Sequence, residues 1–218
     1  MQEINQTIMQ ANYNEHLRLI SYLFDYASEF LSTHLGKDYK MPIPVRQLAY
    51  NCGLIIYETS LCDLNAIERD SYGGFVKLAE TTLRIRRYGC SIGEITGTIK
   101  IEETLSEYAK RYYIAHELAR YILTNKNEIQ PLKVLPIARG EFSLYESTSE
   151  LFANTLAYGI LMPYEQVMQA KAEYEEKGSY NPLSYADWLN YLYNLAQIPE
   201  QYAILGYEEI RKIQLVKS

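Results

Sequence analysis

The segment 111–123 constrains the fold of this chain of 218 residues more than any other. It reads as a helix and contains His116-Glu117-x-x-Arg120. Residues four apart on a helix lie one turn above each other on the same face, so a His-Glu-x-x-His helix offers two imidazoles to one metal. Arginine has no acceptor lone pair and stays protonated at any ordinary pH. The segment therefore predicts a metal-site helix in which Arg120 cannot be a ligand.

Two blocks of sequence resemble the ImmA/IrrE family of small zincin-like metallopeptidases. The first resembles the family's active-site helix through Arg111, Ile114, Ala115, His116, Glu117, Leu118, Tyr121 and Leu123. It departs from the family pattern at Ala119, where the family has glycine, and at Arg120, where it has histidine. The second resembles the family's Glu-x-x-Ala-Asn helix through Glu150, Ala153, Asn154, Ala157, Leu161, Met162 and Pro163. Two blocks in this order are far more specific than one His-Glu pair.

The resemblance implies a role for each residue of the site. In the family, two histidines and a remote glutamate hold zinc, and the motif glutamate takes a proton from the zinc-bound water. Carried over, His116 and Glu150 would be ligands and Glu117 the general base. Arg120 leaves two protein ligands, one fewer than catalytic zinc sites usually have. We therefore expect no cofactor, with zinc only if another side chain completes the site; the candidates are His16, His34, a cysteine and Glu146.

Arg120 has two possible arrangements. Its guanidinium can pair with Glu150, with His116 joining, and so supply the positive charge that a metal would have brought. Alternatively, Glu117 and Arg120, three residues apart on one helix, form an ordinary surface pair worth about 0.2 to 0.5 kcal/mol.

Composition restricts the classes of partner. A net charge of −6 and a pI near 5.2 argue against direct binding to nucleic acid or to an anionic membrane. The sequence has no targeting signal and no run of about 18 apolar residues, and its three cysteines form no Cys-x-x-Cys motif, so we expect a cytoplasmic protein with reduced thiols. The 22 tyrosines indicate either ordinary packing or an interface rich in aromatic anchors.

Hydrophobic periodicity predicts helices and a small, mainly antiparallel sheet of about four strands, which together make an α+β fold. The family resemblance implies that this fold is a zincin-like domain. The predicted strands are 54–59, 75–79, 82–88 and 95–101. The predicted helices are 14–35, 45–52, the active-site helix 105–123, the Glu150-bearing helix 144–162, and C-terminal helices at 165–177, 185–197 and beyond 199. We predict three units: an N-terminal helix in 1–40, the zincin-like domain in 41–163 and a helical extension in 164–218.

Two classes of function remain open from the sequence. The first is a non-catalytic, pseudo-metallopeptidase protein that binds or regulates a protein partner, with strand 95–101 as the edge that holds an extended segment. The second is an active zinc metallo-endopeptidase with a rebuilt ligand set. Family members act on helix-turn-helix repressors and are often phage- or element-borne, so the resemblance implies a transcriptional regulator as partner or substrate.

Overall fold

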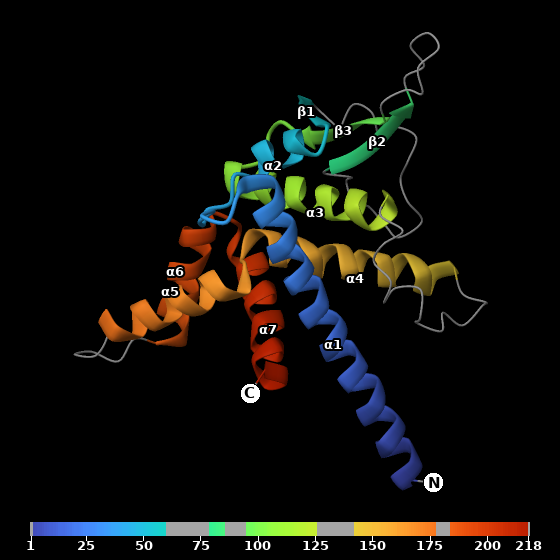
Figure 1. Cartoon of the computed structure of the whole chain (residues 1–218), viewed down its shortest axis with the longest axis vertical. Helices are drawn as coiled ribbons and strands as arrows, with labels where there is room; N and C mark the ends of the chain where they lie inside the picture. Colours follow the sequence, from blue (N-terminus) through green and yellow to red (C-terminus); the bar gives the residue numbers. More distant parts are fainter. Residues whose placement is uncertain (1, 60–78, 86–94, 126–141, 178–183, 218) are drawn as a thin grey trace.

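Residues 2–59, 79–85, 95–125, 142–177 and 184–217 are described by a computed structural model of the chain. Their elements, in chain order, are α1 (Gln2–Leu35), α2 (Val45–Asn51), β1 (Leu54–Thr59), β2 (Ala79–Ile85), β3 (Ile95–Glu102), α3 (Glu107–Asn125), α4 (Phe142–Leu161), α5 (Tyr164–Lys177), α6 (Tyr185–Ala196) and α7 (Glu200–Lys217). Figure 1 shows the sheet at one end, α3 under it, α4 under α3, and α1 and α7 crossing α4. The fold is α+β and mostly helical.

The described sheet is mixed, with strand order β1-β3-β2. β1 pairs with β3 in parallel, with Leu54 opposite Gly97, whereas β2 pairs with β3 in antiparallel, with Ala79 opposite Ile101. The prediction of a mainly antiparallel sheet is therefore wrong for the β1–β3 pair. Alternation of apolar and polar residues indicates which face of a strand is buried, but it does not indicate in which direction a neighbour runs. The predicted strand 75–79 lies, apart from Ala79, outside the described residues.

β3 is the central strand, so the prediction that 95–101 forms an open edge is also wrong. Its backbone pairs with β1 on one side and with β2 on the other. Ile99 and Ile101 have no exposed surface. A strand paired on both sides has no backbone groups left to bind an extended peptide, and in the described sheet the edges are β1 and β2.

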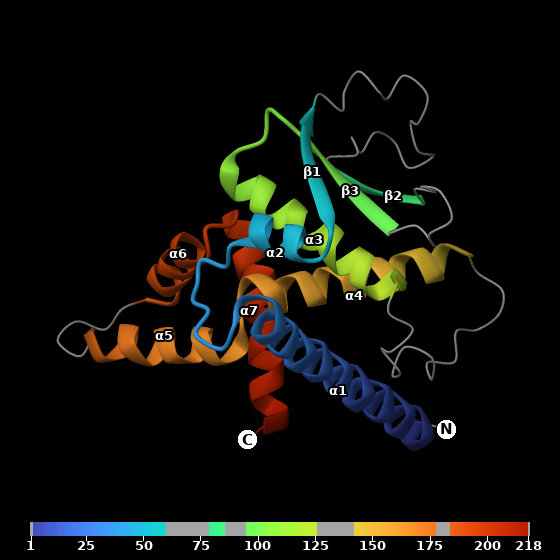
Figure 2. The ribbon, with the colours of Figure 1, turned by 45° about the horizontal axis from the view of Figure 1, so that its top comes forward.

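Helix α3 lies between the sheet and α4 (Figure 2). Ile114, Ala115, Leu118 and Ala119 are completely buried, and Ile122 is nearly so. A surface helix buries one apolar stripe, but a helix between two layers must bury two sides. The His116 helix is therefore an inner element of the fold.

The long helix α1 crosses α4 closely at Gly159, which faces Ala27 and Phe24 of α1. A Cβ atom added to Gly159 of α4 would lie 2.9 Å from the Cβ of Ala27 and 3.4 Å from the Cα of Phe24. Such distances leave no room for another methyl group. Phe24, Ala27 and Leu31 of α1 are buried in the same core as α4.

The C-terminal helices extend this core. Ser184 begins α6 with a capping box, in which its hydroxyl accepts from the Asp187 N–H and the Asp187 carboxylate accepts from the Ser184 N–H. Trp188, Tyr207 and Ile210 are buried in the main core, so α6 and α7 pack on the rest of the protein. None of the helices in the described ranges has the length and apolar character needed to cross a bilayer.

Arg111, at the start of α3, ties three distant segments together through neutral acceptors. Its Nη2 donates to the carbonyl of Ile43 at 2.7 Å and to that of Ala196 at 3.4 Å, and its Nε donates to the carbonyl of Gln197 at 3.1 Å. Gln197 is the left-handed C-cap of α6. Burial lowers the pKa of the Arg111 guanidinium, which still stays charged at ordinary pH. One planar side chain thus fixes both the chain before α2 and the end of α6 to α3.

We expect Arg111→Lys to lower the free energy of unfolding by about 1.5 to 3 kcal/mol, because an ammonium cannot reach three carbonyls in one plane. Urea unfolding followed by fluorescence of Trp188, the single tryptophan, measures this change. Arg211→Lys is the matched control: its partner Glu208 lies on the surface, and we expect a change below about 1 kcal/mol. Equal losses of unfolding free energy in Arg111→Lys and Arg211→Lys would contradict the stabilising role of the Arg111 hydrogen bonds.

A second tether joins β1 to α2 and α3. Glu58 of β1 accepts from Lys110 Nζ at 2.6 Å and from Arg46 Nη2 at 2.5 Å. The Lys110 side chain is only 8% exposed, and its Nζ also lies 3.2 Å from Glu107 Oε1. The hydrogen bonds from Lys110 and Arg46 lower the pKa of Glu58 below its ordinary 4.5. The ionised carboxylate therefore holds the strand against both helices.

The lowered pKa of Glu58 makes this tether dependent on pH. Its contribution to stability is present above the pKa of unfolded Glu58 and is lost as pH falls through the lower pKa of the folded protein. We therefore expect Glu58→Gln to destabilise the protein near pH 7 and to differ little from the parent at about pH 3. Urea titrations across this range provide the measurement, with Glu107→Gln, at a 69% exposed position, as the weaker control. If Glu58→Gln destabilised the protein equally at all pH values, the ionised Glu58 carboxylate would not be the source of this stability.

Candidate functional site

The four predicted site residues come together where α3 faces α4. His116, Glu117 and Arg120 lie on α3, and Glu150 lies on α4. The contacts of α3 with α4 run in opposite directions along the two helices, with Tyr112 against Asn154, and both His116 and Arg120 against Glu150. The helices are therefore antiparallel here. Spacings of four on both helices place the successive contacts one turn apart.

His116 contacts carboxylates on both sides of its ring. Its Nε2 lies 3.1 Å from Glu150 Oε2, and its Nδ1 lies 3.7 Å from Glu117 Oε1. The first distance is that of a hydrogen bond, whereas the second is an electrostatic contact only. The imidazole is mostly buried, with 13% of its side chain exposed. Its orientation is therefore set by Glu150 on the neighbouring helix.

Arg120 contacts both carboxylates. Its Nη1 donates to Glu117 Oε1 at 3.3 Å, and its Nε lies 3.4 Å from Glu150 Oε1. Arg120 thus lies beside Glu150 and Glu117 at the same time. Glu117 has only 3% of its side chain exposed, so its pair with Arg120 is not an ordinary surface pair. Arg120 and Glu150 are nearly half exposed, and they form the open side of the cluster.

These contacts shift the pKa of His116 and of Glu150 in opposite directions. Burial acts to lower the pKa of His116, but hydrogen bonding and the negative charges of Glu117 and Glu150 outweigh it, so the pKa is raised. The hydrogen bond from His116, helped by the charge of Arg120, lowers the pKa of Glu150. Both shifts favour the charged forms, in which two cations face two carboxylates.

The described donors do not match a zinc site with three protein ligands. His116 and Glu150 are the two family ligands present, and they face each other at hydrogen-bonding distance. The third position holds the Arg120 guanidinium, which has no lone pair to offer. Within the described part of the chain, no group of three or more His, Cys, Asp or Glu side chains is arranged to hold a metal ion.

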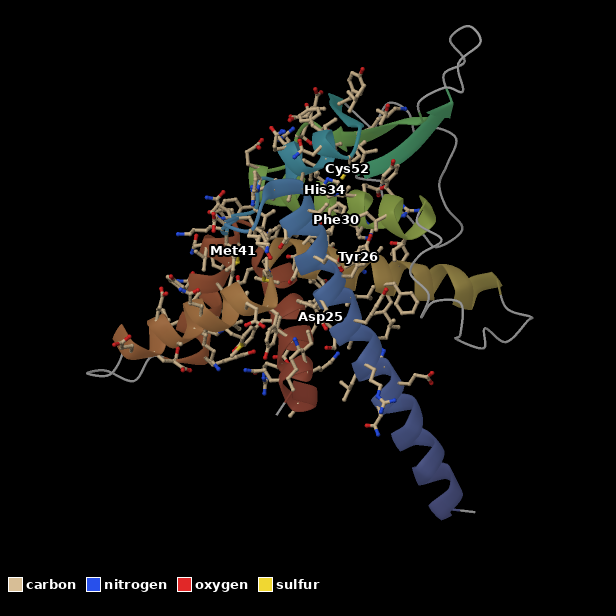
Figure 3. All side chains as sticks on the ribbon, viewed as in Figure 1. Asp25, Tyr26, Phe30, His34, Met41 and Cys52 are labelled. Carbon is tan, nitrogen blue, oxygen red and sulfur yellow. The ribbon has the colours of Figure 1, made fainter. Side chains whose placement is uncertain are left out.

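The side chains considered as replacement ligands lie in other surroundings or outside the described part. His34 sits at the end of α1, where its ring packs on Phe30 at a centroid distance of 4.5 Å (Figure 3). Its carbonyl accepts from the Asn51 side chain. His16 lies near the middle of α1, and Cys52 follows α2. The side chains of Glu146, Cys62 and Cys90 lie outside the described residues.

Three residues next to the cluster were not predicted as part of the site. Tyr112 lies one turn before His116, and its hydroxyl donates to Asn154, one turn after Glu150. Tyr112 is four residues from His116, and Asn154 is four residues from Glu150. This spacing places each on the same helix face as a site residue and could have been used to predict them. Tyr202 of α7 stacks on Tyr112, and no local pattern in the sequence connects these two residues.

A His-Glu helix packed under a small sheet and facing a glutamate-bearing helix defines a metallopeptidase-like α+β domain. Residues 74–183 match the family model for the IrrE N-terminal-like domain of the M78 peptidases. This match covers half of the chain, which belongs to this family, and the resemblance stated from the sequence is confirmed. No curated protein matches the chain. The match does not follow the predicted boundaries 1–40, 41–163 and 164–218, which stay predictions.

The exposure of the carboxylates predicts how strongly each couples to Arg120. Double-mutant cycles with Arg120→Met, Glu117→Gln and Glu150→Gln separate the two pairs. We expect about 1 to 2 kcal/mol for Arg120 with the buried Glu117, and below about 1 kcal/mol for Arg120 with the half-exposed Glu150. Urea unfolding at neutral pH measures all variants. A larger coupling for Glu150 than for Glu117 would contradict this ranking.

Proposed function

We propose that this protein is a non-catalytic member of the IrrE N-terminal-like family that binds or regulates another protein. The observation that carries the proposal is the position of Arg120, whose guanidinium lies between Glu117 and Glu150 on the side where a second imidazole would stand. A fixed cation there repels a divalent ion and already satisfies the carboxylates that such an ion would attract. The shape of the domain is kept while the chemistry of hydrolysis is lost.

The proposed partner is a transcriptional regulator of helix-turn-helix type, and the proposed location is the cytoplasm. The partner follows from the family resemblance, because family members act on such regulators. In the described sheet, β2 is an edge strand that packs on α3, so we assign it, in place of β3, as the strand along which an extended segment would bind. The net charge of −6 makes direct binding to DNA unfavourable.

Metal binding by matched variants tests the loss of chemistry. We expect the parent protein to retain little zinc after dialysis, and Arg120→His to retain about one ion per chain, because the new imidazole stands one turn from His116. Elemental analysis gives the measurement, and circular dichroism checks that the fold is unchanged. Stoichiometric zinc in the parent, or chelator-sensitive cleavage of an unfolded protein such as casein, would overturn the proposal and support the peptidase alternative.

Arg120→His combined with Glu117→Gln is the control for chemistry. This double variant keeps both histidines and Glu150 but lacks the carboxylate that would take a proton from a zinc-bound water. We expect it to bind zinc as Arg120→His does and to cleave nothing. Cleavage by Arg120→His that survives Glu117→Gln would come from a contaminant.

Site-directed crosslinking tests the binding function. Leu151 is 42% exposed and follows Glu150, so a photo-reactive residue there samples a partner that covers the cluster, whereas Leu215 of α7, 68% exposed, samples another surface. We expect a regulator with a DNA-binding domain to crosslink at Leu151 and not at Leu215. Equal crosslinking at both positions, or none at Leu151, would count against the proposed binding site.

A further inference from the structure

One aromatic ring contacts the imidazole of the site without taking part in its ion pairs. Tyr112 lies one turn before His116 on α3, and the two rings are nearly parallel, at an angle of 23° and a centroid distance of 6.1 Å. Tyr112 is 4% exposed. It therefore occupies one side of the imidazole, whose other contacts are the carboxylates of Glu117 and Glu150.

Tyr112 is itself held by two other helices. Its hydroxyl donates to Asn154 Oδ1 of α4 at 2.7 Å, and its ring lies face to face with that of Tyr202 of α7, at a centroid distance of 3.5 Å and an angle of 6°. The Tyr202 hydroxyl is 3.2 Å from that of Tyr113. A ring fixed at its face and at its hydroxyl has little freedom to turn.

The two contacts between α3 and α4 are one turn apart and act together. Tyr112 to Asn154 is the inner contact, and His116 to Glu150 is the outer one. The inner hydrogen bond sets the separation of the helices at the point where the outer pair must meet. A side chain such as leucine would fill much of the same volume, but it could neither make this bond nor present a flat face to the imidazole.

We propose that Tyr112 and Tyr202 are positioning residues, which hold the His116 imidazole in the orientation that pairs with Glu150. Tyr202 acts through Tyr112. It belongs to α7, which lies beyond the matched segment 74–183. The C-terminal helix α7 therefore helps to position the site. A change in the packing of α7 moves Tyr202, and through the ring of Tyr112 it changes the orientation of His116.

Nuclear magnetic resonance of the imidazoles tests this proposal without any metal or partner. The chain has three histidines, so long-range proton–nitrogen spectra contain few signals, and assignment by His116→Gln is direct. We expect Tyr202→Leu to shift the His116 ring resonances, while those of His16 and His34 stay in place. Tyr202→Phe keeps the stacked ring and should restore the parent spectrum of His116.

Tyr174→Leu is the matched control. Tyr174 of α5 is also a half-buried tyrosine of the C-terminal region, with its ring 5.4 Å from Trp188 and 4.9 Å from Tyr191. Its loss removes a similar ring from the core but does not break the path to His116. A His116 signal that moves as much in Tyr174→Leu as in Tyr202→Leu, or that moves in neither, would overturn the proposal.

A second measurement, which alone rests on the proposed function, uses the Arg120→His background. There, Tyr112→Phe, which keeps the ring but removes the hydroxyl that bonds to Asn154, and Tyr202→Leu should each weaken zinc binding by about 10- to 100-fold, as lost support of a ligand does. Undiminished zinc binding in both variants would count against the proposal. Failure of Arg120→His itself to bind zinc would concern the proposed function, and the imidazole spectra would still decide the roles of Tyr112 and Tyr202.

Discussion

The burial of α3 on two sides is the constraint on which the rest of the structure depends. The helix packs against the sheet and against α4, and residues such as Ile114, Leu118 and Ala119 have no exposed surface. Polar side chains on such a helix cannot rely on water, so each must find a partner on its own helix or on the next one. His116, Glu117 and Arg120 meet this requirement through one another and through Glu150. The buried part of the site is held by ion pairs because its helix is an inner one.

The charges of this set explain how the domain keeps its fold with arginine in place of a histidine. Glu117 is almost completely buried, and a buried carboxylate without a positive partner is strongly destabilising. A divalent ion beside a neutral imidazole would bring two positive charges. Arg120 brings one positive charge, and the carboxylates of Glu117 and Glu150 raise the pKa of His116, which favours a second charge on its imidazole. Arg120 therefore gives the buried carboxylate of Glu117 a positive partner.

The residues of the candidate site could be predicted from the sequence because each lies in a local pattern. His116, Glu117 and Arg120 fall on one helical segment, Glu150 opens the second block, and the structure brings all four into contact. The direction of the β1–β3 pair and the central place of β3 could not be predicted, because alternation fixes the buried face of a strand and not its neighbours. The contact of Tyr202 with Tyr112 was missed for a related reason. It joins helices far apart in the chain, and only the packing of α7 creates it.

Two arginines on α3 show how the same side chain serves structure and site. Arg111 and Arg120 are nine residues apart, which is about two and a half turns, so they project from opposite sides of the helix. Arg111 donates to the carbonyls of Ile43, Ala196 and Gln197, and so holds two distant segments against α3. Arg120 contacts the carboxylates of Glu117 and Glu150, on the half-exposed side of the cluster. A guanidinium buried among carbonyls contributes geometry, because its fork fixes several acceptors at once. A guanidinium among carboxylates contributes charge, and charge is what a metal would have contributed there.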